Sequence, residues 1–259
     1  MHLTIHSHLV YDYAEPTDVL VQVEAARCPG QALVSDSLWL TPVDHFVRVP
    51  GHDEVGNRIW LRVEGRMALD YKAEIEVTRQ AEDIAALPAT PPHLLPGNIV
   101  DYLMPSRFSP SDRFAEFVAA EFAGLGGGAC AAALCEWVAA HMTYVPGVSV
   151  ATTCATDTFV QRQGVCRDYA HLLIALARAA AIPARYASVY APDVSPPDFH
   201  AVAQVFLDGD WHLLDPTGMA APQDIALIGV GRDAADIPFL SSFGRALFVE
   251  QSVSVVRGG

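Results

Sequence analysis

The segment from Cys166 to Ala181 constrains the fold of this chain more than any other. It is rich in Ala and Leu and contains neither Pro nor Gly until Ile182-Pro183 ends it, which predicts a helix that begins near the cysteine. The run Leu172–Leu176 makes this helix apolar nearly all round, so we expect other elements to bury it. The Cys166 thiol would lie in the first turn, where unpaired N–H groups and the helix dipole favour a thiolate and lower the thiol pKa from about 8.5.

A β-hairpin is predicted after this helix. Two extended runs, His200–Leu207 and Trp211–Asp215, flank the turn signal Asp208-Gly209. With a two-residue turn, the register puts His200 and Asp215 on one face of the sheet, a diagonal step apart and within roughly 8 Å. A three-residue turn without a compensating bulge would put them on opposite faces. The prediction that these two residues meet therefore depends on the turn type.

Cys166, His200 and Asp215 are candidate catalytic residues, in which a thiol nucleophile would be served by a base and an orienting carboxylate. Taken singly, a cysteine on an apolar helix or a histidine on a strand is more often a core residue. Here the three fall at a helix start, at a strand start and on the paired strand, and independent core residues have no reason to coincide there. The Cys166 N–H is one candidate oxyanion donor, and a side-chain donor could be Tyr144, Gln161, Gln163 or Trp137.

The motifs around these residues resemble the core of the bacterial transglutaminase-like superfamily. The resemblance rests on Gly164–Leu172, Ala181–Tyr186, His200-Ala201 and Trp211–Thr217, and it extends to Tyr102–Phe108 and Gly231–Asp236. It implies a papain-like core in which Cys166 is the nucleophile, His200 the general base and Asp215 the orienting residue. One position departs from the family pattern, because Val202 stands where these proteins commonly have Trp, and this bears on the shape of the acyl site.

A Pro-rich stretch over residues 87–97 divides the chain, since it fits neither a regular helix nor a central strand. Residues 1–87 are predicted to form an N-terminal antiparallel β-sandwich domain, because short strand-like runs alternate with turn signals. The resemblance agrees, since bacterial transglutaminase-like proteins carry such a β domain. The predicted strands are Leu3–Tyr13, Val19–Ala25, Leu33–Leu40, His45–Val49, Arg58–Glu64 and Ala68–Arg79.

Residues 97–259 are predicted to form the transglutaminase-like catalytic domain. Apolar stripes indicate one helix after Ser109–Asp112 and a second that carries Cys130 to His141. The Cys166 helix, a strand at Arg185–Tyr190 and the hairpin follow, and Ala246–Val256 is predicted as a last strand. Helices packed on an antiparallel sheet give an α+β fold with a transglutaminase/papain-like core.

Composition limits the partners and the location. The chain has 259 residues, of which 51% are hydrophobic and 18% charged, which is enough apolar surface for a core. A formal net charge of −14 argues against nucleic acid and against anionic membrane surfaces as partners. The N-terminus has neither a basic start nor an apolar core, and Arg178 interrupts the longest apolar stretch. We therefore expect no signal peptide, no membrane span and a cytoplasmic location, which five cysteines without a Cys-x-x-Cys pair also favour.

No metal or organic cofactor is expected. The nearest approach to a metal-ligand cluster is His2, His6 and His8, and an exposed polar strand face explains these residues better. Gly229-Val230-Gly231 lacks the third glycine and the following helix of a dinucleotide-binding loop. The chemistry therefore rests on the side chains of the triad.

Three functions compete. The first, which we favour, is a cysteine peptidase or amidase acting on a peptide or protein amide through a thioacyl-enzyme. The second is transfer of the acyl group from a protein glutamine to an amine, and the third is a non-catalytic module that has kept the fold. The complete triad argues against the third function. The sequence gives no basis for predicting the substrate or the oligomeric state.

Overall fold

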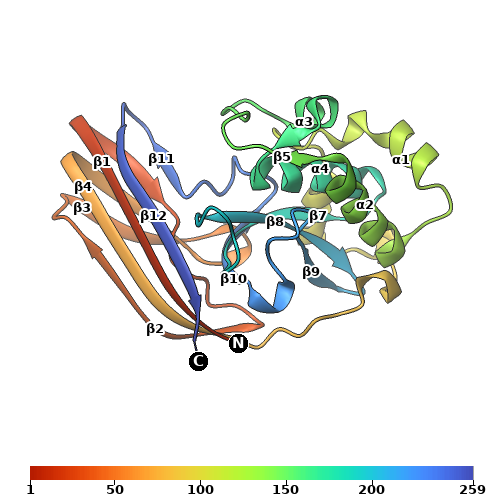
Figure 1. Cartoon of the computed structure of the whole chain (residues 1–259), viewed down its shortest axis with the longest axis horizontal. Coiled ribbons are helices and arrows are strands. Elements are labelled where there is room, and N and C mark those ends of the chain that lie inside the picture. Colours follow the sequence, from red (N-terminus) through yellow and green to blue (C-terminus); the bar gives the residue numbers. More distant parts are fainter. Residues whose placement is uncertain (259) are drawn as a thin grey trace.

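A computed structural model describes residues 1–258 of the chain. A large bent β-sheet lies at one side, a smaller sheet lies in the middle, and the α-helices cover the other face of the smaller sheet (Figure 1). This arrangement confirms the α+β class and the β-rich N-terminal region.

The helices are α1 (Ala115–Glu121), α2 (Gly127–His141), α3 (Ala155–Gln161) and α4 (Cys166–Ala179). The six-stranded sheet contains β1 (His2–Val21), β2 (Gln31–Leu40), β3 (His45–Pro50), β4 (Asn57–Val77), β11 (Leu240–Ser242) and β12 (Leu247–Arg257). The four-stranded sheet has the order β10-β7-β8-β9, formed by Ala226–Gly231, Ala184–Tyr190, His200–Leu207 and Asp210–Leu214. A short parallel pair joins β5 (Thr143–Tyr144) to β6 (Gln163–Gly164).

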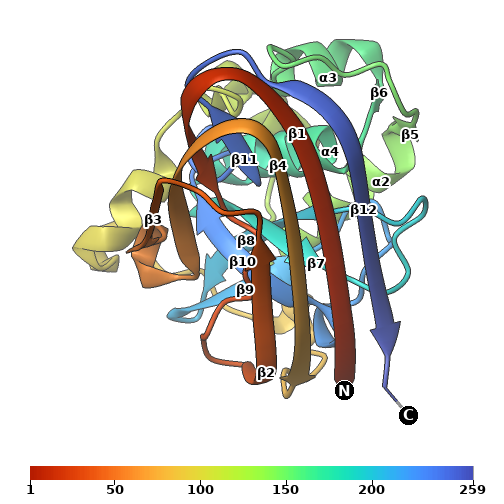
Figure 2. The ribbon, with the colours of Figure 1, turned by 90° about the vertical axis from the view of Figure 1, so that its left-hand side faces the viewer.

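The N-terminal strands are fewer and longer than predicted. β1 joins the first two predicted strands and β4 joins the last two, and each strand bends sharply midway (Figure 2). The bends coincide, because the register between the two strands shifts between Tyr13 and Thr17 and Tyr13 pairs with Gly65. Gly65 has φ +70°, a conformation that glycine adopts without steric cost. The two predicted layers are therefore two halves of one antiparallel sheet folded around a shared core.

The C-terminal strands belong to this N-terminal sheet. β12 pairs antiparallel with the first half of β1, from Leu3 opposite Arg257 to Asp12 opposite Leu247, and β11 pairs with the second half. The last strand predicted from the sequence is present, but the predicted catalytic region of residues 97–259 includes a segment that completes the N-terminal sheet. The local sequence pattern identifies β12 as a strand but does not identify its partner. The partner, β1, lies at the other end of the chain, beyond the reach of any local pattern.

The helix that begins at Cys166 is the centre of the catalytic half, as its all-round apolar sequence predicts. α4 lies against β7 and β8, and α1, α2 and α3 pack around it (Figure 1). The side chains from Leu172 to Ala177 are completely buried. Such a helix is held from every side, so its first residue has a fixed position.

The two halves share a core. Tyr190, Ala226 and Ile228 of the four-stranded sheet are buried in the same apolar cluster as the inward side chains of β1 and β4. The predicted linker consists of irregular chain with short 3₁₀ turns, and its Leu87 carbonyl accepts a hydrogen bond from Gly128 N–H of α2 at 2.9 Å. The division near residues 87–97 therefore marks a change of secondary structure within one packed body.

Candidate active site

Cys166 is the first residue of α4, and a capping hydrogen bond fixes the chain at this point. Asp168, in the first turn, accepts a hydrogen bond from Val165 N–H through Oδ2 at 2.9 Å. Gly164 is needed just before, because a Cβ at that position would lie 2.7 Å from the Asp168 Cβ. The half-buried thiol therefore stands at a helix N-terminus, where backbone N–H groups lack helical partners.

Asp168 and Arg167 also hold the loop that precedes α3. Asp168 Oδ1 accepts a hydrogen bond from Ser149 Oγ at 2.9 Å, and Arg167 donates to Ser149 Oγ at 2.6 Å and to the Val150 carbonyl at 2.7 Å. The catalytic motifs of the sequence do not mark Asp168 as a site residue. The sequence feature that could have identified Asp168 is its place as an acidic residue at the third position of the helix, where the side chain of a capping box accepts a hydrogen bond from the N-cap N–H.

His200 and Asp215 meet as the hairpin register predicts. Asp208 and Gly209 both have positive φ, 48° and 84°, which is the two-residue type I′ turn, and Leu207 pairs with Asp210. His200 Nε2 lies 2.9 Å from Asp215 Oδ2, and the two side chains are 0% and 1% exposed. The structure thus brings the predicted base and the predicted orienting residue into direct contact.

Both oxygens of the Asp215 carboxylate are held by the loop that follows β9. Oδ1 accepts hydrogen bonds from Thr217 N–H at 2.9 Å and Thr217 Oγ1 at 2.7 Å, and Oδ2 accepts one from Ala220 N–H at 2.9 Å. Burial favours the protonated acid, but His200 and Thr217 outweigh burial and lower the pKa of Asp215. Asp215 is therefore a fixed anion that sets the orientation of the imidazole.

The imidazole of His200 lies between Asp215 and the Cys166 thiol. Burial disfavours its charged form, but the Asp215 carboxylate and the adjacent thiol outweigh burial and raise the pKa of His200 to about 9. Because Nε2 bonds to Asp215, Nδ1 is the nitrogen left for Cys166, and it is buried without any hydrogen-bond partner among residues 1–258. All three predicted site residues therefore come together in one cluster.

Of the predicted side-chain oxyanion donors, Tyr144 lies at the thiol. Tyr144 on β5 pairs with Gly164 on β6, two residues before the cysteine, which places Tyr144 beside the start of α4. Burial, together with the adjacent Cys166, raises the pKa of Tyr144 to about 12, so the phenol keeps its proton. Gln161 and Gln163 are exposed, and Trp137 packs against His141 and an aromatic group of α1 and α3.

Val202, the position that departs from the family pattern, lies in the core. It is completely buried in an apolar cluster with Ala187 and Leu213 of the neighbouring strands. The smaller side chain therefore does not form part of the exposed surface beside Cys166.

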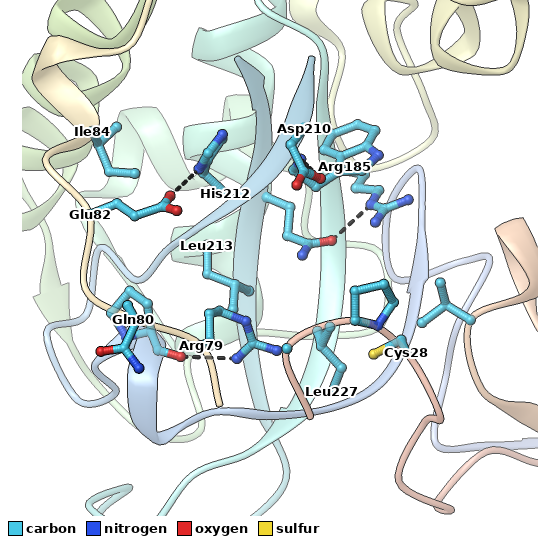
Figure 3. Close-up of a pocket in the computed structure, with 16 residues that line it drawn as sticks. Cys28, Arg79, Gln80, Glu82, Ile84, Arg185, Asp210, His212, Leu213 and Leu227 are labelled. Atoms are coloured by element: carbon cyan, nitrogen blue, oxygen red, sulfur yellow. Dashed lines mark hydrogen bonds and ion pairs between the residues drawn. The ribbon is translucent and has the colours of Figure 1, made fainter. Parts of the chain in front are cut away.

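A cavity of about 290 Å³ lies apart from the triad (Figure 3). Its walls come from the N-terminal loop at Cys28, the chain leaving β4 at Arg79 and Glu82, and the sheet at Arg185 and His212. Several of its polar groups bond to other protein groups: His212 Nδ1 to Glu82 at 2.6 Å, Arg185 to Gln204 at 2.8 Å and Arg79 to the Ile225 carbonyl at 2.9 Å. The bonds made by Glu82 and Arg79 tie the N-terminal half to the sheet that carries His200, and the bond between Arg185 and Gln204 joins two strands of that sheet.

The histidines near the N-terminus lie on an outer strand face. His6 Nε2 and His8 Nδ1 both approach Asp70 Oδ1, at 3.0 and 3.1 Å. Across residues 1–258, no group of three or more His, Cys, Asp or Glu side chains is arranged to hold a metal ion. In the same residues, every helix is too short or too polar to cross a bilayer.

The fold and the site define a class: α+β proteins in which a cysteine at the start of a buried helix faces a His–Asp pair on an antiparallel hairpin. A sequence model of the transglutaminase-like superfamily matches residues 121–216, which include Cys166, His200 and Asp215. A candidate cysteine protease from Cytophaga hutchinsonii, known from its crystal structure, is 31% identical, with a TM-score of 0.93 over 99% of this chain and 90% of that chain. The chain therefore belongs to the transglutaminase-like superfamily.

Similarity also extends to mycobacterial proteins over a shorter region. An uncharacterized protein of Mycobacterium leprae (strain TN) is 31% identical over 114 residues, which cover 40% of this chain and 40% of that protein. An uncharacterized protein of Mycobacterium tuberculosis (strain ATCC 25618 / H37Rv) is 34% identical over 111 residues, 37% of this chain and 35% of that protein. The match thus spans less than half the length of either relative.

Proposed function

We propose that this protein is a thiol-dependent acyl-transfer enzyme that hydrolyses peptide or protein amides, with Cys166 as nucleophile, His200 as general acid and base and Asp215 as orienting residue. The observation that carries this proposal is the placement of His200 between a fixed Asp215 carboxylate and the Cys166 thiol. The similarity to a candidate cysteine protease over nearly the whole chain supports it.

In the proposed reaction, the Cys166 sulfur attacks the carbonyl carbon of the amide after its proton has passed to His200. The oxyanion forms beside the Cys166 N–H at the helix N-terminus and the Tyr144 phenol of the neighbouring strand β5. The C–N bond then breaks, and His200 protonates the leaving amine. Water attacks the thioester with His200 as base, which releases the acid and restores the thiol.

The acceptor of the acyl group distinguishes hydrolysis from cross-linking. We expect fluorogenic peptide amides to be hydrolysed, and addition of a primary amine such as putrescine to leave the acid as the main product. Mass spectrometry of the products measures the ratio of acid to amide. If the product is mostly the new amide, the function is acyl transfer to amines instead of hydrolysis. If neither peptides nor activated esters are turned over, the protein is a non-catalytic module.

Iodoacetamide at neutral pH is expected to label Cys166 before the other cysteines, because His200 can take the thiol proton. Burial raises the pKa of Cys28, Cys130 and Cys135, in the last case to about 12 with help from Asp215. Cys154 is the matched control, since it is also half-buried and also lies at a helix N-terminus. We expect Cys166 to react about tenfold faster than Cys154, measured by mass spectrometry of labelled peptides.

The same experiment on His200→Ala tests the cause of the reactivity. Labelling of Cys166 should slow to a rate near that of Cys154. Equal rates for the two thiols in the unchanged protein, after correction for exposure, would contradict the assignment of Cys166 as nucleophile.

The dependence of kcat/KM on pH is expected to report His200. Its raised pKa means that the imidazolium persists up to about pH 9, so kcat/KM should fall as the pH rises through that value. Asp215→Asn removes a carboxylate that raises this pKa, and the alkaline limb should therefore move to lower pH. Asp210→Asn on the same hairpin is the control, because the Asp210 side chain is exposed and, within residues 1–258, accepts a hydrogen bond from its neighbour Trp211 N–H alone. An alkaline limb that stays in place in Asp215→Asn would show that the limb belongs to another group.

The cytoplasmic location stays a prediction, as does the lack of a cofactor, of nucleic acid and of a membrane as partners. All five cysteines are free thiols in the structure, which is compatible with a reducing compartment.

A further inference from the structure

The chain just before His200 is held by the N-terminal sheet. Asp198 Oδ1 accepts hydrogen bonds from Phe199 N–H at 2.7 Å and from Gln251 Nε2 of β12 at 2.5 Å. The Phe199 ring stacks on Phe239, just before β11, with centroids 5.0 Å apart. The candidate base therefore follows directly on two residues that contact the N-terminal sheet, and Figure 1 shows β12 on the side of the sheet toward β8.

Strand register identifies what the N-terminal sheet presents beside Asp198. Leu9 and Tyr13 of β1 are buried in the core, so the odd-numbered residues of this half of β1 point inward. Gln251 is opposite Leu9 and Phe248 is opposite Tyr11, so all of these side chains share the inner face. Beyond the contact between Gln251 and Asp198, the next residues on the inner face are an aromatic pair, Tyr11 and Phe248.

This aromatic pair is open to solvent. The rings of Tyr11 and Phe248 meet edge to face with centroids 5.6 Å apart, and Phe248 is 58% exposed. Exposed aromatic side chains grouped on one surface mark binding sites more often than scattered ones do. Tyr11 is half-buried against the core of the sheet, so the open part of the pair is Phe248.

Asp198 connects this pair to the chain segment that carries His200. Burial raises the pKa of Tyr11, and the Asp198 carboxylate raises it further. Burial and Cys166 raise the pKa of Tyr144, and Asp198 adds to that effect too. Asp198 comes two residues before His200 and bonds to Gln251, which shares the inner face with the aromatic pair, so the carboxylate lies between that pair and the candidate base.

We propose that Tyr11, Phe248 and Asp198 form a subsite of the candidate active site that binds a basic side chain, Arg or Lys, of the peptide substrate. Asp198 is exposed, and its Oδ2 makes no hydrogen bond within residues 1–258, so one carboxylate oxygen is free to pair with a cation. Aromatic faces beside it attract the same cation and cover the apolar stem of its side chain. The formal net charge of −14 adds a general attraction for basic peptides. This inference rests on the proposed function.

The test uses fluorogenic peptides that differ at one position, with Arg, norleucine or Glu placed in turn at each of three sites on both sides of the cleaved amide. We expect Arg to exceed norleucine by about tenfold in kcat/KM at one site, with Glu lowest. Arginine is chosen because its guanidinium does not serve as an acyl acceptor, so the preference reports binding. The ratio of Arg to norleucine is the readout, because general damage to the enzyme lowers both rates together.

Asp198→Asn should reduce this ratio to near one, since the amide keeps the Oδ1 acceptor that holds Phe199 and Gln251 but loses the charge. Phe248→Ala should lower the ratio as well, mainly through KM. Trp39→Ala is the matched control, because Trp39 is 56% exposed on the same sheet but pairs with Asp70 on the outer face. It should leave the ratio unchanged.

Two results would overturn the inference while the proposed function stands: peptides cleaved without a preference for Arg, or an Arg preference that survives both Asp198→Asn and Phe248→Ala. Norleucine favoured over Arg would show that the aromatic pair binds apolar side chains instead. If neither peptides nor a small activated ester are turned over, the proposed function fails. Fluorescence anisotropy then measures the affinity of the same peptides for Cys166→Ala and tests the subsite by binding alone. Equal affinity for the Arg and Glu peptides would exclude the subsite.

Discussion

Cys166→Ala is expected to abolish acyl transfer, and His200→Ala to lower kcat by about 10³-fold or more. Without the imidazole, the Cys166 thiol loses its proton acceptor and the leaving amine loses its proton donor. Asp215→Ala should cost less, because this carboxylate acts by orienting and charging His200 through the contact of 2.9 Å. Cys154→Ala is the control, since it removes a thiol from another helix N-terminus and should keep full activity.

The double variant His200→Ala/Asp215→Ala makes this prediction decisive. Residues that work as one unit give losses that do not add, so the double variant should be about as slow as His200→Ala alone. The assay uses an activated ester, which needs little protonation of the leaving group, and circular dichroism verifies the fold of each variant. A further large loss in a folded double variant would mean that Asp215 acts somewhere other than on His200.

Residues 97–259 expressed alone are expected to lose the native fold, although every candidate catalytic group lies within them. Tyr190, Ala226 and Ile228 would exchange the buried core they share with β1 and β4 for water. β12 would lose its partner along the whole of its pairing with β1. Thermal unfolding followed by circular dichroism should show no cooperative transition, and selective labelling of Cys166 should disappear.

A nicked chain provides the control for this fragment. A protease site placed in the exposed stretch Thr90–Leu95 should allow the backbone to be cut while both halves remain associated. We expect the nicked protein to keep its melting transition and its labelling pattern. A stable fragment 97–259 that still labels Cys166 selectively would show that the N-terminal sheet is dispensable for the site.

The candidate site could be predicted from the sequence because its parts depend on local signals. An Ala- and Leu-rich run ended by Ile182-Pro183 specifies the helix that starts at Cys166, and Asp208-Gly209 selects a two-residue turn. That turn fixes the register that brings His200 to Asp215. Interactions between neighbours in the chain determine these elements, whereas the approach of Cys166 to His200 depends on how α4 packs against β8.

Tertiary structure alone decided how the two ends of the chain meet. The sequence marks Ala246–Val256 as a strand, but its pairing with β1 joins segments at opposite ends of the chain, and any apolar edge strand carries the same local pattern. The same holds for Asp198, whose proximity to Gln251 and Tyr11 follows from that pairing. Contacts between distant segments depend on how complete surfaces pack together, and the secondary-structure preferences of single residues do not determine that packing.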